Sequence, residues 1–432
     1  MARVLEVRWH RRCRFVISGR SLRPAPMRFG YQWSASPRAS RARLCGPGRS
    51  ADSGSVAFKV LWTAYSALLG AVLWLSVLAA PWRPWSTQER LDEAWGDVGQ
   101  GADLRDITVL IPARNEVQVI ARCLSALGAQ GKDLRVVIVD DQSTDATVAA
   151  IPALPALRLE VIAGRPLPEG WAGKLWALEQ GLQRVHTPFT LLLDADIVLA
   201  PGLVAILRAR LLQQGLDLIS VMPWLRMQAF WERLLIPAFI FFFKLLYPFR
   251  LANSGSARFA AAAGGCILLR TEALHRIGGF AALRGALIDD CTLARRVKVA
   301  GGLTWIGLTR SAWSLRSYRR LSELWNMVAR SAFTQLRYST VLLFACTLIM
   351  MIGFWGPVVG LALGEGMVRW VGLLGWSALC VSYLPTLLYY RLSPLWALLL
   401  PIIAMLYLAM TWTSAVRYWR GIRSRWKGRT YV

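Results

Sequence analysis

Acidic residues are scarce in this chain of 432 amino acids. It has 25 Asp and Glu against 51 Lys and Arg, which gives a formal net charge of +26 at pH 7. A charge of this sign can indicate nucleic-acid binding, but the basic residues are nearly all arginine, are scattered, and form no known nucleic-acid motif. The composition therefore favours a membrane surface or an anionic substrate, and we expect no nucleic-acid partner.

Cysteine is also sparse, and its spacing excludes two kinds of site. The seven cysteines lie far apart, without a CxxC pair and without metal-ligand spacing. This pattern argues against a disulfide framework and against a zinc site. It is typical of free or buried thiols in a reducing compartment.

Residues 1–55 contain almost no acids and no apolar run of signal-peptide length, but are rich in Arg, Ser, Pro and Gly. This composition predicts a disordered basic extension. An Arg-rich, acid-poor start also resembles a transit peptide. The simpler explanation is that the given sequence begins upstream of the true start of the protein, which would be nearer Met27 or Val56.

Long apolar runs, by contrast, are frequent. The mean hydropathy of +0.39 and a hydrophobic share of 55% are high for a soluble protein of this length. Four runs with few charges reach the roughly 20 residues that a helix needs to cross a bilayer core of about 30 Å. They are residues 56–80, 341–363, 371–390 and 395–416. We expect four transmembrane helices, one before and three (341–416) after a soluble domain; buried core helices are the alternative.

A fifth apolar run, residues 230–249, is interrupted by charges and prolines. These are Glu232, Arg233, Pro237, Lys244 and Pro248. We expect an interfacial segment, with its aromatic side chains in the headgroup layer and with Arg233 and Lys244 meeting lipid phosphates. A buried core helix is the alternative.

Residues 107–335 have the pattern of an α/β domain. Continuous Val, Ile and Leu runs alternate with helical stretches, which predicts a parallel sheet covered on both faces. The expected strands are 107–112, 134–141, 157–164 and 189–196, and the expected helices are 116–130, 144–151 and 174–185.

Two of the expected strands end in pairs of acids. Asp140 and Asp141 follow VVIV, and Asp194 and Asp196 follow LLL. Ligands of open α/β sheets bind beyond the carboxyl ends of parallel strands, where clustered acids repel one another unless a cation or ligand is present. Helix capping, expected for Asp145, is the alternative. Hard oxygen ligands suit Mg²⁺ or Mn²⁺ bound partly through substrate phosphates, so these ends predict a divalent cation that holds a diphosphate.

A third acidic position opens the predicted helix of "DDCTLARRV" (289–297). Asp289 and Asp290 at a helix start are favoured by the helix dipole, so simple capping is the alternative. The glycine-rich segment 261–280 precedes them, and Gly264 and Gly265 would let a ligand approach the backbone closely. This favours a substrate wall.

Taken together, the motifs resemble family 2 glycosyltransferases with the GT-A fold. Six segments follow one another in the order and rough spacing of that family: TVLIPARNE (108–116), VVIVDDQSTDAT (136–147), GKLWALEQGL (173–182), LLLDAD (191–196), the glycine-rich segment (261–280) and DDCTLARRV (289–297). PEGWAGKLWAL (168–178), WNMVARSAFTQLRYS (325–339) and the flanking spans resemble the hopene-associated branch, with ceramide glucosyltransferases as more distant relatives. The fold implied is a GT-A domain (nucleotide-diphospho-sugar transferase, Rossmann-like) embedded in an α-helical multi-pass membrane protein.

The resemblance implies a role for each matching residue. Those bordering the donor would be Pro112, Ala113, Asn115, Glu116, Asp140, Asp141, Lys174 and Asp194. Among these, Asp140 or Asp141 would bind the base or ribose, and Lys174 would neutralise the diphosphate unless it is simply a solvated helix residue. Asp196 matches the metal-binding acid of the DxD motif and Asp290 the general base. Asp289 and Arg296 belong to the same motif as Asp290.

The reaction implied is inverting transfer of a single sugar from a nucleotide-diphospho-sugar to a membrane lipid hydroxyl, with a hopanoid as the expected acceptor. Two departures from the family pattern bear on this. Asp289 stands where the family usually has Glu, and the QxxRW motif of processive synthases is absent, which favours single-sugar transfer. The alternatives are a polyprenyl-phosphate or ceramide-type acceptor and, in another class, a non-catalytic nucleotide-sugar-binding scaffold.

The expected location is the bacterial inner (cytoplasmic) membrane, with the catalytic domain facing the cytoplasm where activated sugars are made. One span before the domain and three after it put both termini on the other side. The basic tail, residues 417–432, would instead prefer the cytoplasm. Either the tail breaks the charge rule or one of the C-terminal segments does not span.

Overall fold

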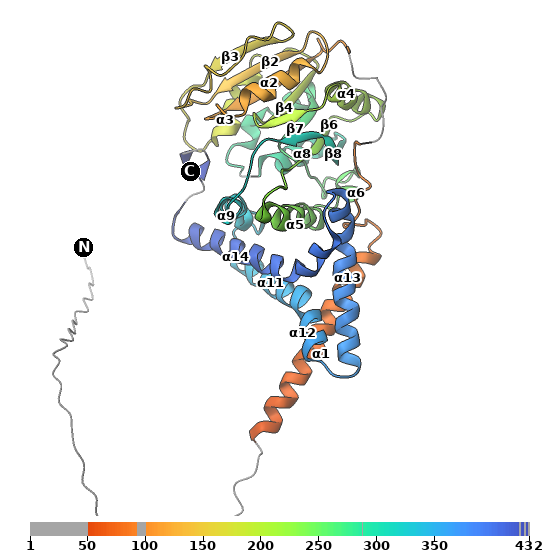
Figure 1. Ribbon diagram of the computed structural model, residues 1–432. Helices are drawn as coiled ribbons and strands as arrows, with labels where there is room; N and C mark the ends of the chain where they lie inside the picture. The colour runs from red at the N-terminus through yellow and green to blue at the C-terminus, as the bar shows by residue number, and fades with distance from the viewer. Residues whose placement is uncertain (1–50, 93–100, 287, 423–424, 427–428, 431–432) are drawn as a thin grey trace, which may run out of the picture. The chain divides into compact units, whose positions relative to one another are not determined.

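The computed structural model describes residues 51–92, 101–286, 288–422, 425–426 and 429–430 (Figure 1). The predicted basic extension therefore lies outside the described residues except for 51–55. These belong to helix α1 (Ala51–Ala79), so the expectation of disorder is wrong for them.

The domain is built on an eight-stranded mixed sheet. Its order is β3-β2-β1-β4-β7-β6-β8-β5. The bounds are β1 Ile107–Ala113, β2 Arg135–Asp140, β3 Arg158–Ala163, β4 Phe189–Leu193, β5 Ile197–Leu199, β6 Leu218–Trp224, β7 Cys266–Arg270 and β8 Thr304–Ser314. The four predicted strands are β1 to β4, and they pair in parallel as expected. β7 runs antiparallel between β4 and β6, so the sheet is mixed.

Helices cover both faces of the sheet, which is why its central strands β1 and β4 are buried along their whole length, whereas the edge strand β3 is partly exposed. Helices α2 (Ile120–Gly128) and α4 (Leu203–Gln213) share one buried cluster with the strands. Helices α3 (Gly173–Leu182) and α8 (Asp289–Val299) share the cluster on the opposite face. Two further short elements are α7 (Thr271–Arg276) and a 3-10 turn, η2 (Phe280–Leu283).

The predicted helix at 144–151 is wrong, because this segment forms bends and turns. The Asp145 side chain accepts the backbone N–H of Thr147 and of Val117, and the Thr147 hydroxyl accepts the Glu116 N–H at 2.8 Å. Short polar side chains of this kind compete with helical hydrogen bonding. Asp145 therefore stabilises a turn and does not cap a helix.

Below the sheet lies a layer of helices that contains the fifth apolar run. It comprises α5 (Phe230–Leu246), α6 (Phe249–Ala252), α9 (Leu321–Ala329) and α10 (Ala332–Gln335). In α5, Phe241 is fully buried between Trp74 and Tyr383, with ring centroids 6.2 and 5.1 Å away. Lys244 is 1% exposed and donates to the Trp85 carbonyl. The expectation that Lys244 meets lipid phosphates is therefore wrong, and the buried alternative describes this face of α5.

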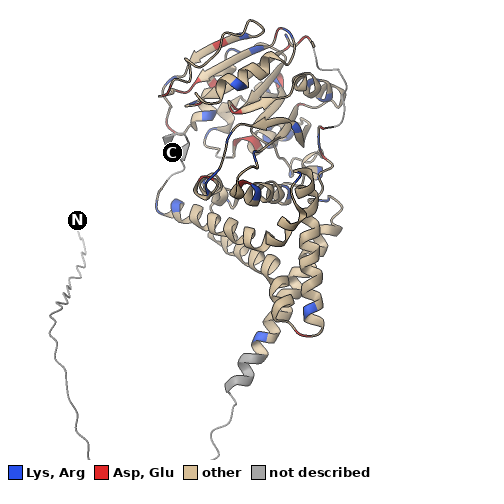
Figure 2. Cartoon of the chain, in the orientation of Figure 1, with Lys and Arg blue, Asp and Glu red and all other residues tan. Residues whose placement is uncertain are grey.

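The four predicted spans are helices long and apolar enough to cross a membrane, and Figure 2 shows them almost free of charge. They are Ala57–Ala79 in α1, Thr340–Leu363, Met367–Tyr389 and Pro394–Trp419. The second consists of α11 (Thr340–Met350), a π turn η3 (Met351–Trp355) and α12 (Gly356–Leu363). The third is α13 (Met367–Tyr389), and the last is a 3-10 turn η4 (Pro394–Leu399) followed by α14 (Leu400–Trp419).

These helices divide into two arrangements (Figure 1). α1, α12 and α13 pack on one another through small residues and run away from the sheet. α14 instead runs beneath α5 and α9 and is hydrogen-bonded to that layer along its length. From α14, the Tyr407 hydroxyl donates to the Leu235 carbonyl at 2.8 Å and Arg417 donates to Asn326 Oδ1 at 2.8 Å. In the other direction, the Trp325 indole donates to the Thr413 hydroxyl at 3.2 Å and the Phe333 N–H to the Ser414 hydroxyl at 3.1 Å.

Candidate functional site

A cavity of about 330 Å³ opens at the carboxyl ends of β1 and β4, between the sheet and the helix layer. It brings together nine of the predicted site residues: Pro112, Glu116, Lys174, Asp194, Asp196, Gly264, Gly265, Asp289 and Asp290. They come from five separate parts of the domain, so the parallel strand ends and the start of α8 converge as expected.

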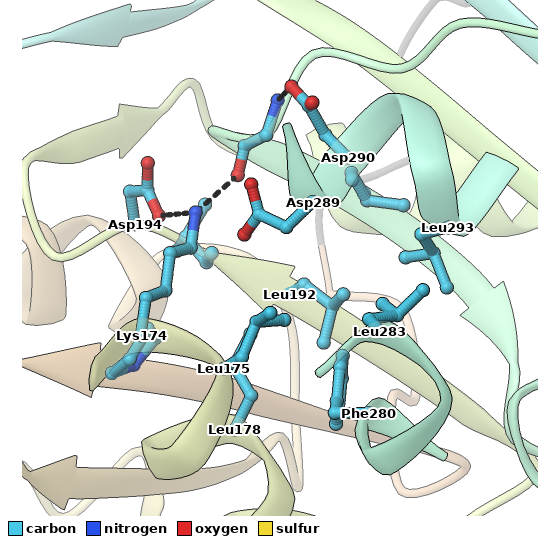
Figure 3. A pocket seen from close by; sticks show the side chains of 14 residues that line it. Lys174, Leu175, Leu178, Leu192, Asp194, Phe280, Leu283, Asp289, Asp290 and Leu293 are labelled. Carbon is cyan, nitrogen blue, oxygen red and sulfur yellow. Dashed lines mark hydrogen bonds and ion pairs between the residues drawn. The ribbon is translucent and has the colours of Figure 1, made fainter. Parts of the chain in front are cut away.

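Lys174, in the first turn of α3, links two of the acidic positions (Figure 3). Its Nζ lies 2.7 Å from Asp194 Oδ1 and donates to the Gly264 carbonyl at 3.3 Å. Burial alone would lower the pKa of Lys174, but the surrounding carboxylates, Asp194 first, outweigh it and raise the pKa above its usual value. The ammonium therefore stays charged and faces the cavity, so the solvated alternative does not describe it.

Asp290 is held by the backbone on the other side of Lys174. Its Oδ2 accepts the Gly264 N–H at 2.9 Å, and its Oδ1 accepts the Cys291 N–H at 2.8 Å. Burial, with the neighbouring Asp289 carboxylate, raises the pKa of Asp290 to about 6. A Cβ on Gly264 would lie 3.2 Å from Asp290 Oδ2 and 3.5 Å from the Lys174 Nζ, so glycine there leaves room for both side chains.

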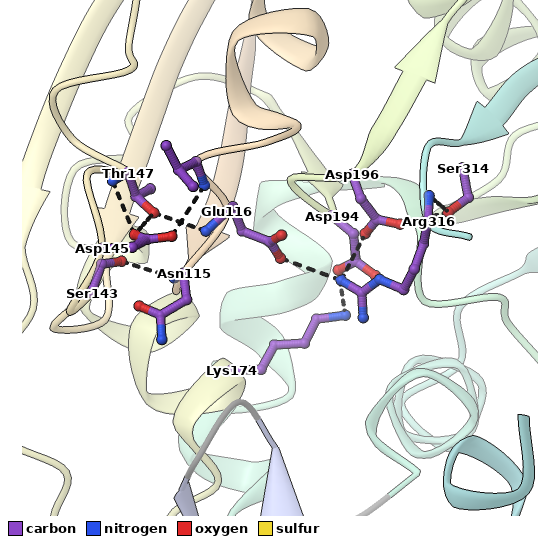
Figure 4. A network of polar contacts seen from close by, with 11 residues as sticks. Asn115, Glu116, Ser143, Asp145, Thr147, Lys174, Asp194, Asp196, Ser314 and Arg316 are labelled. Atoms are coloured by element: carbon purple, nitrogen blue, oxygen red, sulfur yellow. Dashed lines mark hydrogen bonds and ion pairs between the residues drawn. The ribbon is translucent and has the colours of Figure 1, made fainter. Parts of the chain in front are cut away.

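Asp196 faces a residue that the sequence did not point to, Arg316 (Figure 4). One guanidinium nitrogen, Nη2, lies 3.4 Å from Asp196 Oδ1 and 3.3 Å from Glu116 Oε1. The Ser314 hydroxyl donates to Asp196 Oδ2 at 2.5 Å. Glu116 is oriented in turn by its backbone bond to Thr147.

The side of the cavity next to the helix layer is mainly apolar, although Arg330 at the end of α9 also lines it. Phe239 and Phe243, one turn apart on α5, line it together with Met327 of α9 and Leu225. Tyr318 joins them and is held by its backbone N–H, which donates to the buried Glu232 at 2.7 Å. The cavity thus has a charged end at the sheet and a mainly apolar wall at α5 and α9, with Arg330 at the end of α9.

Residues 108–278 match the family described as glycosyl transferase family 2. This chain contains a family 2 glycosyltransferase domain. The strand order, the covering helices and the four candidate spans agree with the GT-A fold in a membrane-associated protein.

Three relatives give the extent of the likeness. A 4,4'-diaponeurosporenoate glycosyltransferase of Staphylococcus haemolyticus is 28% identical over 127 residues, 29% of this chain and 34% of that protein. Its counterpart in Staphylococcus aureus is 30% identical over 129 residues, again 34% of its length. The matches thus span about a third of these curated relatives. A solved mannosyltransferase of Pyrobaculum calidifontis, in complex with GDP-Man and Mn²⁺, is 19% identical over 82% of this chain and 98% of that one, with a TM-score of 0.47.

Some predicted donor residues of the glycosyltransferase domain lie beside the cavity and do not line it. They are Ala113, Asn115, Asp140 and Asp141. Ala113 and Asp140 pair across β1 and β2, and Asp141 is fully buried. Asn115 has a φ of +53° and its side chain accepts the Thr144 N–H at 2.8 Å. Their base and ribose contacts stay a prediction.

Arg296 of the glycosyltransferase domain is exposed on α8 and does not line the cavity, so the structure does not bring it to the substrate wall. The inward-facing basic residue of α8 is Lys298, which donates to four carbonyls between Ala252 and Phe259 at 2.6–3.3 Å. Because it serves backbone carbonyls, its role is to hold that loop.

Asp194 and Asp196 are the residues of the glycosyltransferase domain that could hold a divalent cation. Within the described ranges no three His, Cys, Asp or Glu side chains are grouped for a metal ion. Mg²⁺ commonly binds through one or two carboxylates and completes its shell with substrate phosphates and water. The two aspartates fit that mode of binding.

Several cavity residues were missed from sequence: Ser314, Arg316, Tyr318 and Arg330. Arg316 and Tyr318 follow β8 in the basic stretch SLRSYRRL (314–321), which carries no acid and no motif. Of these residues, only Arg330 could have been predicted from the sequence, because it lies within the segment 325–339 that resembles the hopene-associated branch.

Proposed function

We propose that this protein is a membrane-bound glycosyltransferase that moves a single sugar from a nucleotide-diphospho-sugar to a lipid hydroxyl, with inversion at the anomeric carbon. The observation that supports it is the single cavity that joins the charged pair Lys174 and Asp194 to Asp290 and then to an apolar wall. A donor diphosphate suits the charged end and an acceptor lipid suits the apolar end, so the base stands between them.

The residues divide the chemistry as follows. Asp290 accepts the proton of the acceptor hydroxyl while the acceptor oxygen forms its bond to the anomeric carbon and the bond to the diphosphate breaks. Lys174 neutralises charge that develops on the leaving diphosphate. A divalent cation bound at Asp196 would supply further electrostatic stabilisation of that leaving group.

The acceptor is best described by the chemistry of the apolar wall. Phe239, Phe243 and Met327 offer aromatic and thioether surface without a charge, which suits the body of a rigid, largely apolar lipid. A hopanoid is the acceptor implied by the resemblance. The names of the staphylococcal relatives add a carotenoid-type terpenoid. Polyprenyl phosphate and ceramide remain the alternatives within the enzyme class.

Purified full-length protein incubated with a panel of nucleotide-sugars and extracted membrane lipids tests the proposal. We expect one lipid to gain the mass of one hexose-type sugar, and the lipid that gains it identifies the acceptor. A ladder of added sugars would contradict single-sugar transfer. The absence of sugar-nucleotide turnover with every donor, in protein that binds nucleotide-sugar, would instead favour the non-catalytic scaffold.

A further inference from the structure

Arg316 occupies the point between two acids that come from different strands. Its Nη2 is within 3.4 Å of both Glu116 Oε1 and Asp196 Oδ1. Both carboxylate side chains are only 10% exposed, whereas the arginine side chain is 36% exposed and lines the cavity. One cation therefore balances two nearly buried acids and is itself reachable from the cavity.

The backbone fixes this position. Ser314 of β8 pairs with Ile197 of β5 in the antiparallel register, and the Leu315 N–H donates to the Asp196 carbonyl at 2.8 Å. The Arg316 N–H then donates to the Ser314 hydroxyl at 3.2 Å, and that hydroxyl donates to Asp196. Because these bonds start from Asp196 itself, they fix the backbone of Arg316 beside this carboxylate while the two strands are paired, and they leave its side chain able to turn within the cavity.

The charges of the cavity explain what a cation does there. Its lining has five carboxylates, Glu116, Asp194, Asp196, Asp289 and Asp290, against the three cations Lys174, Arg316 and Arg330. A nucleotide-diphospho-sugar adds further negative charge, so donor binding needs added positive charge beside the strand ends. Without Arg316, Glu116 and Asp196 would face each other as nearly buried anions, which is a costly arrangement.

We propose that Arg316 is an exchangeable internal cation: it holds Glu116 and Asp196 together before the donor binds, yields Asp196 to the divalent cation that accompanies the donor, and then pairs with the diphosphate. This rests on the proposed function. A divalent cation held by Asp196 would be repelled by the guanidinium 3.4 Å from the same carboxylate, so the two cations would compete for Asp196. Arg316 is thus a positioning residue that also makes metal binding depend on the donor.

The test is Mn²⁺ binding by the full-length protein in detergent, followed by the electron paramagnetic resonance signal of free Mn²⁺, with and without a nucleoside diphosphate. Wild-type protein should bind Mn²⁺ weakly until the nucleotide is added. Arg316→Met should bind Mn²⁺ about tenfold more tightly than wild type without nucleotide, a difference of about 1.4 kcal/mol. Arg295→Met, which alters an exposed arginine outside the cavity, should behave as wild type.

Thermal unfolding is a second measurement, and it shows whether the variants have lost stability. Arg316→Met should unfold at a lower temperature than wild type in chelator and recover on addition of Mn²⁺. Arg316→Lys should lie between them in both measurements, because its ammonium keeps the charge but lacks the length and the five donors of the guanidinium. Equal Mn²⁺ affinity of all variants without nucleotide would overturn the proposal. Mn²⁺ binding can be measured without sugar transfer, so the two proposals can fail separately. If Arg316→Met binds Mn²⁺ more tightly but the wild-type protein transfers no sugar, the proposed function is wrong and the proposed role of Arg316 is still supported.

Discussion

The Asp290 carboxylate carries two backbone N–H bonds and faces both Asp289 and Lys174. The N–H donors of Gly264 and Cys291 favour its charged form, while burial and Asp289 oppose it, and the balance raises the pKa to about 6. At neutral pH the group is therefore mostly ionised and able to accept a proton. This supports the general-base role that the resemblance implied.

Replacing this base should separate chemistry from donor binding. We expect Asp290→Asn to lower the transfer rate by about 10²–10⁴-fold, because the amide keeps the shape but accepts no proton. Donor affinity, measured by titration calorimetry on the same preparation, should stay near wild type. A matching loss of donor affinity would place Asp290 in the donor site.

Asp290 should also determine how the activity of the wild-type enzyme depends on pH. The base works only when ionised, so transfer should be complete above the raised pKa of Asp290 and should be lost as the pH falls through about 6. The residual activity of Asp290→Asn should show no such loss. A wild-type profile that is flat from pH 5 to pH 8, about one unit or more on either side of that pKa, would exclude Asp290 as the base.

Asp196 should be the acid on which metal dependence rests. We expect Asp196→Ala to abolish transfer and wild-type activity to vanish in excess chelator and return with Mg²⁺ or Mn²⁺, because a divalent cation there would stabilise the leaving group. Turnover is measured with the lipid that gains sugar in the panel experiment. Full activity in excess chelator would show that the cations of the chain, Lys174 and Arg316, suffice.

At this scale the sequence predicted the acids well and their partners poorly. Asp194, Asp196 and Asp290 could be found because strand ends and helix starts have recognisable patterns. Arg316 could not, because its place depends on the antiparallel pairing of β8 with β5, more than a hundred residues away in the chain. The prediction for Arg296 missed because helical phase decides which basic residue of α8 points inward, and that residue is Lys298.

Among the elements, α5 has two faces with different roles. Phe241 packs on Trp74 and Tyr383, so its replacement by serine would unfold part of the helix layer, as phenylalanine truncation in a core costs about 3–5 kcal/mol. Phe239 and Phe243 face the cavity instead. Replacing all of Phe241, Phe242 and Phe243 would mix the two effects.

The cavity face of α5 should govern acceptor use. We expect Phe239→Ser and Phe243→Ser to depress transfer to lipid about tenfold more than donor hydrolysis, because they remove apolar contacts worth more than 1 kcal/mol from the acceptor side only. Phe230→Ser is the matched control, since Phe230 is 57% exposed on the same helix and does not line the cavity. If both activities fall together in folded protein, or neither falls, α5 does not bind the acceptor.

Periodicity predicted the elements that are buried on both faces and failed where side chains bond to the loop backbone. The strands β1, β2 and β4 were clear because each is a mostly continuous apolar run, whereas β3 lies at the sheet edge and is partly exposed. The segment 144–151 became a turn because Asp145 and Thr147 bond to the loop after β1. For α5, the charges suggested the membrane surface, whereas Lys244 is buried against Trp85 and Glu232 bonds to the Tyr318 backbone.

For the whole molecule, hydropathy identified the four long helices and left their direction open. α14 is joined by hydrogen bonds to α5, α9 and α10, and these helices carry groups such as Glu323, Asn326 and Arg330. If α14 crossed the bilayer core, these polar groups would have to enter it with α14, at high cost. The contacts therefore favour an α14 that lies along the membrane surface.

The last prediction is that the chain crosses the membrane three times, through α1, α11 with α12, and α13. The catalytic domain and the basic tail then lie on the same side, which satisfies the charge rule with the domain in the cytoplasm. Reporters are fused after Leu392 and after Val432, on either side of α14. At both positions we expect green fluorescent protein to fluoresce and alkaline phosphatase to be inactive. A reporter inserted in the Gly364–Gly366 turn should give the reverse. Opposite results at Leu392 and Val432 would mean that α14 spans the bilayer.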